Sequence, residues 1–153
     1  MIGSYNQGLV VVSLLVAILA SYTALDMSAR VANSQSRRAA RIWLVGGAMA
    51  MGLGIWSMHF IGMLAFKLPI PVGYDLFLTT CSLAASIAAS MYALWLGSRQ
   101  RLPVSRLLAG AVLMGLGIAA MHYIGMAAMQ MQPGIDYDPL WFAASILIAI
   151  GAS

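Results

Sequence analysis

Long apolar runs separated by short charged segments make up the sequence. Five long runs contain no Asp, Glu, Lys or Arg, and they cover residues 1–25, 42–66, 76–98, 107–135 and 139–153. A helix needs about 20 apolar residues to cross the ~30 Å of hydrocarbon in a bilayer, and the first four runs are long enough. The fifth run is too short to cross, so we expect a truncated helix and a chain that is a fragment of a longer protein.

The composition also indicates a membrane protein. Hydrophobic residues make up 62% of the chain and charged residues 8%, whereas a soluble domain carries about 25% charged residues. A disordered chain would be poor in apolar residues and rich in charge. We therefore predict an all-α fold: a polytopic transmembrane helical bundle with four full spans and a truncated fifth. The predicted partner of its outer surface is the lipid bilayer.

The positions of the charges predict the orientation of the spans. The loop between spans one and two and the loop between spans three and four hold seven of the eight basic residues: Arg30, Arg37, Arg38, Arg41, Arg99, Arg101 and Arg106. Cytoplasmic loops are enriched in Lys and Arg, so both loops should face the cytoplasm and the N-terminus should be extracytoplasmic. The net charge of +4 therefore reflects topology, and no nucleic-acid partner is predicted.

Single polar residues predict local structure at the span ends. Asp75 and Asp138 precede apolar runs as helix N-caps do, and Pro139 stands at the favoured first helical position. Asp26 and Arg30 are four residues apart, so they should form an ion pair on one helix face. Spans two and four should end at Pro and Gly residues: Pro69, Pro71, Gly73, Pro133 and Gly134.

An internal repeat relates the spans to one another. Residues 51–63 realign on residues 114–126 at an offset of 63, with ten of the thirteen positions identical. Spans one and three match at an offset of 69, which pairs Ser13 with Ser82, and residues 145–153 resemble the start of the same pattern. We expect parallel helix hairpins related by an axis along the membrane normal, in a single domain, 1–153, with units of about 9–68, 76–131 and an incomplete 139–153.

The two histidines of the chain occupy equivalent positions, His59 in span two and His122 in span four. At ~1.5 Å per residue, each lies about 13 Å inside the end of its span. Polar side chains at this depth normally face the bundle interior and are paired, ligated or functional. Four methionines lie beside the histidines: Met58, Met63, Met121 and Met126. Four glycines on the same helices would allow neighbouring helices to approach closely: Gly52, Gly62, Gly115 and Gly125.

Imidazole and thioether groups together form a soft set of metal ligands. Such a set suits copper better than Mg or Ca, and the lack of nearby carboxylates or thiolates argues against zinc. We therefore predict a copper site formed by the Met/His pairs. Two alternatives use the same residues. Each Met could fill a packing gap while each His is a satisfied interhelical hydrogen-bond partner, or the two histidines could hold a haem as axial ligands.

The motifs Met58-His-Phe-Ile and Met121-His-Tyr-Ile, each followed by Gly-Met, resemble the MHYT family of bacterial inner-membrane sensor domains. The resemblance covers the whole chain. It implies an N-terminal input domain with three motifs that binds copper near the outer face through the motif residues and senses oxygen, carbon monoxide or nitric oxide. It also implies C-terminal cytoplasmic output domains, often GGDEF and EAL domains that make and degrade cyclic di-GMP. The chain departs from the family pattern at Ile61 and Ile124, which replace Thr, and in lacking a third motif.

No sequence pattern in the chain indicates catalysis, because a Ser/His/Asp set, a carboxylate pair, a P-loop and a dinucleotide fingerprint are all missing. We predict a sensory input domain in a homodimer, in which a diatomic gas acts at the copper site and controls a diguanylate cyclase or phosphodiesterase in the full-length protein. The competing classes are a copper or small-solute carrier, which would need a polar path across the membrane, and a structural anchor that dimerises the output domains.

Overall fold

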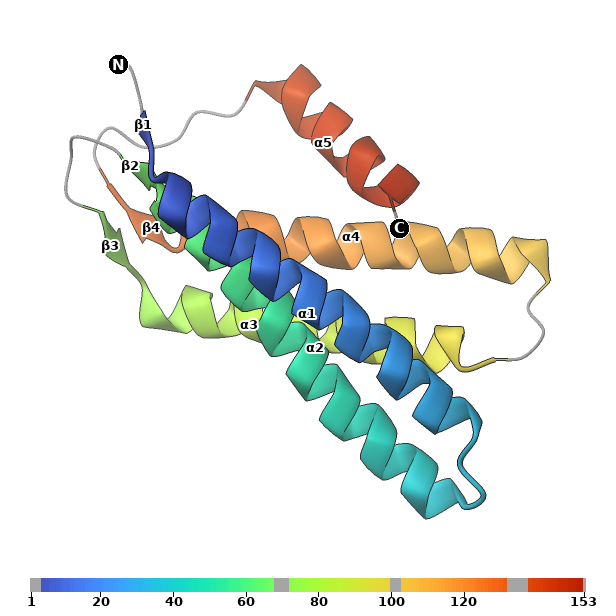
Figure 1. Cartoon of the computed structure of the whole chain (residues 1–153). Helices are drawn as coiled ribbons and strands as arrows, with labels where there is room; N and C mark the ends of the chain where they lie inside the picture. Colours follow the sequence, from blue (N-terminus) through green and yellow to red (C-terminus); the bar gives the residue numbers. More distant parts are fainter. Residues whose placement is uncertain (1–3, 68–71, 100–102, 132–137, 153) are drawn as a thin grey trace.

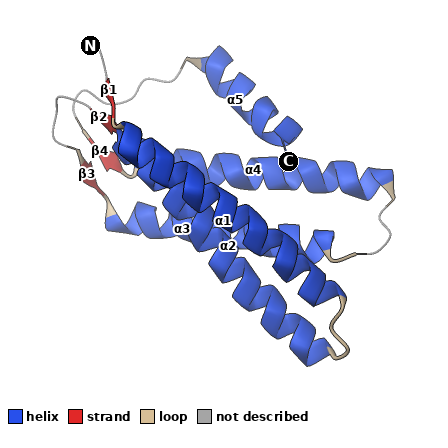
Figure 2. Ribbon diagram, viewed as in Figure 1, coloured by secondary structure: helices blue, strands red, loops and turns tan. Residues whose placement is uncertain are grey.

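A computed structural model describes residues 4–67, 72–99, 103–131 and 138–152. This part of the chain contains five helices and four two-residue strands (Figures 1 and 2), in the order β1 (Ser4–Tyr5), α1 (Gln7–Ala32), α2 (Arg37–Ala65), β2 (Phe66–Lys67), β3 (Gly73–Tyr74), α3 (Leu76–Gly97), α4 (Val104–Ala127), β4 (Met129–Gln130) and α5 (Pro139–Ala152). Helices α1 to α4 are each long and apolar enough to cross a membrane. The predicted all-α bundle is therefore confirmed, and the chain is a multi-pass membrane protein.

The capping residues predicted from the sequence act as caps. Asp75 and Asp138 each accept a backbone N–H bond from the first turn of the following helix, at 2.9 and 2.8 Å, and α5 begins at Pro139. Asp26 and Arg30 form the expected ion pair at 2.7 Å. Gly73 belongs to β3, whereas the other predicted span-ending residues lie outside the described residues: Pro69, Pro71, Pro133 and Gly134.

Short antiparallel strand pairs close the two hairpins at the same end of the molecule (Figure 1). β1 pairs with β2 beside the α1–α2 hairpin, and β3 pairs with β4 beside the α3–α4 hairpin. Next to each pair runs a backbone hydrogen bond of 2.8 Å, from Asn6 N to Ala65 O and from Asp75 N to Ala128 O. These residues are equivalent by the offsets of 69 and 63, so the hairpins repeat in structure as well as in sequence. The strand pairs were not predicted, because two residues are too few for a periodic pattern.

Small residues set the spacing within each hairpin. A Cβ placed at Gly54 would lie 2.9 Å from the Cβ of Ala20, and one at Gly117 would lie 2.8 Å from the Cβ of Ala89. Both distances are far shorter than ordinary side-chain contacts, so α1 and α2 approach as closely as α3 and α4 do. The two contacts join equivalent residues of the repeat.

Glycines also set the spacing between one hairpin and the next helix. A Cβ at Gly52 would lie 2.7 Å from Ile87 Cα, and one at Gly115 would lie 2.5 Å from Ile150 Cα. No side chain fits between these backbones, which is how small residues bring membrane helices together. The two isoleucines are 63 residues apart, like the two glycines. Helix α5 therefore contacts α4 as α3 contacts α2 (Figure 1).

Candidate metal centre

Helices α2 and α4 bring the two histidines together from different hairpins. His122 Nδ1 lies 3.3 Å from His59 Nε2, and the ring centroids are 4.7 Å apart with an interplanar angle of 69°. A hydrogen bond at this position requires a proton on one nitrogen and a lone pair on the other. Both rings are half-buried. The histidines paired by the sequence repeat thus form one cluster inside the bundle.

A half-open pocket of about 360 Å³ borders the histidine pair. Both histidines line it, together with the methionines that precede them in the chain, Met58 and Met121. The other two methionines of the predicted site, Met63 and Met126, are half-buried and are not among its lining residues. The remaining lining residues come from α2, α4 and α5: Ile55, Ile118, Ala119, Tyr123, Ser145 and Ala149.

The glycines of the predicted site contact different neighbours. A Cβ at Gly125 would lie 3.7 Å from His59 Nε2, so this glycine borders the histidine pair. Gly62 faces α1, whereas Gly52 and Gly115 contact the first helix of the following repeat. Gly52 and Gly115 therefore bring α3 and α5 close against the histidine helices, and the two histidine side chains span the distance between α2 and α4.

Two serine hydroxyls hold the backbone of the histidine motifs. Ser13 Oγ donates to the carbonyl of Met58 at 2.9 Å, and Ser82 Oγ donates to the carbonyl of Met121 at 2.8 Å. The first bond joins α1 to α2 and the second joins α3 to α4, again at equivalent positions. The sequence repeat shows that the two serines are at equivalent positions. It does not show that each hydroxyl bonds the carbonyl of a methionine on the next helix.

Aromatic rings enclose the histidine pair on both sides. The Phe60 ring lies edge-on to His59 at 6.0 Å, and the Tyr123 ring lies edge-on to His122 at 4.9 Å. Phe60 also contacts Tyr74, 5.8 Å away, and burial raises the pKa of the Tyr74 phenol above its ordinary value. The Tyr123 hydroxyl forms a hydrogen bond with the hydroxyl of Ser145 on α5. Through this bond the start of the third repeat contacts the site.

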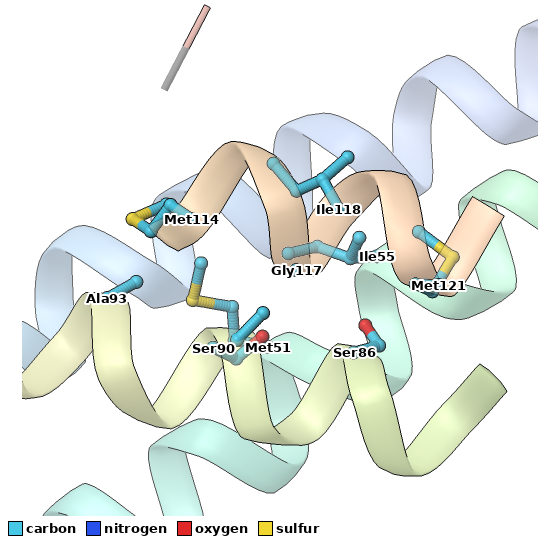
Figure 3. A pocket seen from close by; sticks show the side chains of 10 residues that line it. Met51, Ile55, Ser86, Ser90, Ala93, Met114, Gly117, Ile118 and Met121 are labelled. Carbon is cyan, nitrogen blue, oxygen red and sulfur yellow. The ribbon is translucent and has the colours of Figure 1, made fainter. Parts of the chain in front are cut away.

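A smaller cavity of about 20 Å³ adjoins the pocket between α2, α3 and α4 (Figure 3). It shares Ile55, Ile118 and Met121 with the pocket. The Ser90 hydroxyl on its wall is buried and makes no hydrogen bond with the described residues. A space of this size holds about one water molecule. The interior next to the histidine pair is therefore not fully packed.

We expect Ser82→Ala to destabilise the fold by about 1 kcal/mol, the net value of a typical buried hydrogen bond. Ser82 is fully buried and its bond to Met121 crosses between helices. The control is Thr80→Val, because the exposed Thr80 hydroxyl only donates within its own helix, to Leu76. Thermal unfolding in detergent should show a lower midpoint for Ser82→Ala than for Thr80→Val. Equal midpoints would show that the interhelical bond contributes nothing.

Comparison with protein families matches residues 52–110 and 115–153 to the family described as "Bacterial signalling protein N terminal repeat". The two matched segments begin at Gly52 and Gly115, which are also paired by the offset of 63. The family match therefore has the same 63-residue period as the contacts in the structure, although its segments begin inside α2 and α4 and not at the start of a hairpin.

Three curated relatives match nearly the whole chain. The chain is 64% identical over 153 residues to the bifunctional diguanylate cyclase/cyclic di-GMP phosphodiesterase MucR of Pseudomonas aeruginosa, a match that covers 100% of this chain and 22% of MucR. It is 49% identical to the cyclic di-GMP phosphodiesterase NbdA of the same organism and 43% identical to the signaling protein YkoW of Bacillus subtilis, each over 150 residues. These matches cover 98% of this chain and 19% and 18% of the relatives. The chain thus spans about a fifth of their length, and no solved structure matches it.

Proposed function

Because the chain belongs to the MHYT family of bacterial signalling proteins, we propose that its histidine pair binds copper and that the domain senses a diatomic gas. The observation that carries the proposal is the 3.3 Å contact between His59 and His122 in a pocket that Met58 and Met121 also line. The segment itself is a membrane signalling domain without an enzymatic part, since it matches only the N-terminal repeat region of relatives that are multidomain enzymes.

The spacing of the two ring nitrogens supports a metal between them. A tetrahedral ion with bonds of about 2.0–2.1 Å to nitrogen keeps two ligand nitrogens about 3.3 Å apart. The described residues contain no group of three or more His, Cys, Asp or Glu side chains that could hold a metal. Further ligands from this part of the chain would be thioethers, and imidazole with thioether suits copper. Copper would supply affinity for oxygen, carbon monoxide or nitric oxide.

The contact between the imidazole rings favours copper over a haem. An axial pair of histidines must hold a flat macrocycle between the two ring nitrogens. In this structure the nitrogens face each other directly, so a porphyrin would require α2 and α4 to separate. A single small ion would require only that the bridging proton move to the other nitrogen of its ring and that the two rings turn their lone pairs towards the ion.

We propose that the protein lies in the bacterial inner membrane with the histidine end of the bundle on the extracytoplasmic side. The signal would then pass through the helices to a cytoplasmic output domain. Helices α1 and α3 end, and α2 and α4 begin, on the side of the molecule opposite the strand pairs (Figure 1), and seven arginines lie near these helix ends in the sequence. Basic residues concentrate in cytoplasmic loops. MucR and NbdA are cyclic di-GMP enzymes by name, so synthesis or degradation of cyclic di-GMP is the proposed output.

The proposal is tested by metal analysis of the purified protein. We expect copper in the wild type and its loss from the double variant His59→Ala and His122→Ala, because the two ring nitrogens would both be gone. An optical spectrum of the same samples would show a haem by its Soret band. No copper in the wild type, or equal copper in wild type and double variant, would refute the copper site.

A further inference from the structure

We propose that an exposed stripe on α1 is the docking surface for a further helix of the α2 and α4 type, supplied by the polypeptide that follows residue 153 in the full-length protein. The α1 stripe consists of five exposed residues on one face of the helix: Leu14, Ile18, Ser21, Tyr22 and Leu25. Their spacing, at positions i, i+4, i+7, i+8 and i+11, is that of a helix face buried against a partner. The inference does not depend on copper.

The equivalent stripe on α3 is covered. The residues 69 positions later are all buried or half-buried: Leu83, Ile87, Ser90, Met91 and Leu94. The largest difference is at the end of the stripe, where Leu25 is 73% exposed and Leu94 is 2% exposed. Helix α2 covers the α3 stripe through the close contact between Gly52 and Ile87. The α1 stripe therefore has the residue pattern of a covered surface but no cover among the described residues.

Helix α5 shows that the same kind of interface forms more than once. Ile146 and Ile150 on α5 correspond to Leu14 and Ile18, and both are half-buried. Ile150 packs its backbone against Gly115 of α4, as Ile87 does against Gly52. In both cases the covering helix is the second helix of the preceding repeat. The helix that covers Ile18 should accordingly be the second helix of a repeat and carry a glycine opposite Ile18.

Two positions beside the stripe are exposed on α1, α3 and α5 alike. Leu15 and Leu19 are exposed on α1, and so are their counterparts on α3 (Ala84, Ala88) and on α5 (Leu147, Gly151). These neighbouring positions face away from the bundle in every repeat. On α1 both the stripe and these neighbouring positions are exposed, and only at the stripe are the counterparts on α3 and α5 covered.

The occupant we propose is the partner of α5 in a third hairpin. Helix α5 stands in the place of a first helix, since it contacts α4 as α3 contacts α2. A second helix returning beside α5 and covering Ile18 would pass the half-open pocket, which α5 borders through Ser145 and Ala149. It would close a ring of three hairpins around His59 and His122. The relatives extend far beyond the matched region, because the chain covers 22% of MucR and 19% of NbdA.

Photo-crosslinking in the full-length protein tests this inference. The crosslinker p-benzoyl-phenylalanine would be introduced at Tyr22, where it replaces one exposed aromatic ring by another, and at Ile18. The matched control is Leu19, which is 65% exposed, close to the 64% of Ile18, but lies beside the stripe. After irradiation of protein in lipid nanodiscs, mass spectrometry would identify the attached partner.

We expect Tyr22 and Ile18 to crosslink to a peptide from beyond residue 153 of the same chain and Leu19 to label lipid. Lipid adducts at all three positions would overturn the proposal by showing that the stripe is a lipid surface. A covalent dimer of two copies would overturn it in favour of an intermolecular interface. The Tyr22 variant keeps the test decisive if the bulkier change at Ile18 prevents folding.

Discussion

The substitution Gly52→Val should separate α2 from α3 and destabilise the fold by about 3 kcal/mol or more, at or above the upper end of the usual cost of overpacking. A Cβ at Gly52 would lie 2.7 Å from Ile87 Cα and 2.9 Å from Ile87 N. These are backbone atoms, so no rotamer change can relieve the clash. The Gly52 carbonyl also accepts a hydrogen bond of 2.9 Å from Ser86, which separation of the helices would break.

The matched control for this prediction is Gly46→Val, on the same helix. A Cβ at Gly46 meets no atom within 4 Å, so valine there changes only the helix propensity, by less than about 1 kcal/mol. Thermal unfolding and size-exclusion profiles in detergent would compare the two variants. If Gly46→Val and Gly52→Val behaved alike, the close approach of α2 and α3 would not be a feature of the folded protein.

Much of the fold follows from sequence patterns that act over short distances. The length of each apolar run predicts a span, and the caps Asp75 and Asp138 predict where two helices begin. The duplicated motif places His59 and His122 at the same depth because both lie at the same point of a repeated hairpin. An internal repeat relates residues that are far apart in the chain, because equivalent residues occupy equivalent places in the fold. The contact between the two rings was therefore predictable from one sequence.

The orientation of side chains around the site was not predictable in the same way. Helical spacing places the methionine at i+4, Met63 or Met126, on the same helix face as the histidine, and turns the methionine that precedes the histidine about 100° away. Which of them faces the partner helix depends on how the helices cross, and crossing is set by the glycine contacts with α3 and α5. In the structure Met58 and Met121 line the pocket. The serine hydroxyls that bond their carbonyls depend on the same register and were missed.

The choice between the two pairs of methionines leads to the second large effect. Replacing Met58 and Met121 by Leu should weaken binding of Cu(I) by at least about tenfold for each thioether, or about 1.4 kcal/mol each. These methionines line the pocket beside the histidines. Met to Leu nearly conserves volume, so the cost to folding should stay below about 1.5 kcal/mol. Competition with a chromophoric Cu(I) chelator would measure the affinity.

The control is the same double change at Met63 and Met126, which are not among the lining residues of the pocket. It removes the same atoms from the same two helices five residues further along, and we expect the affinity for Cu(I) to stay within about twofold of the wild type, a difference of about 0.4 kcal/mol. A loss of affinity in this control alone would place the thioether ligands at these later positions on α2 and α4. Loss in neither variant would leave the histidines as the protein's only ligands from this segment. The two double variants therefore separate the contribution of the histidines to the Cu(I) affinity from the contribution of the thioethers. The structure brings the two histidines together, whereas the position of each thioether depends on which helix face carries the methionine.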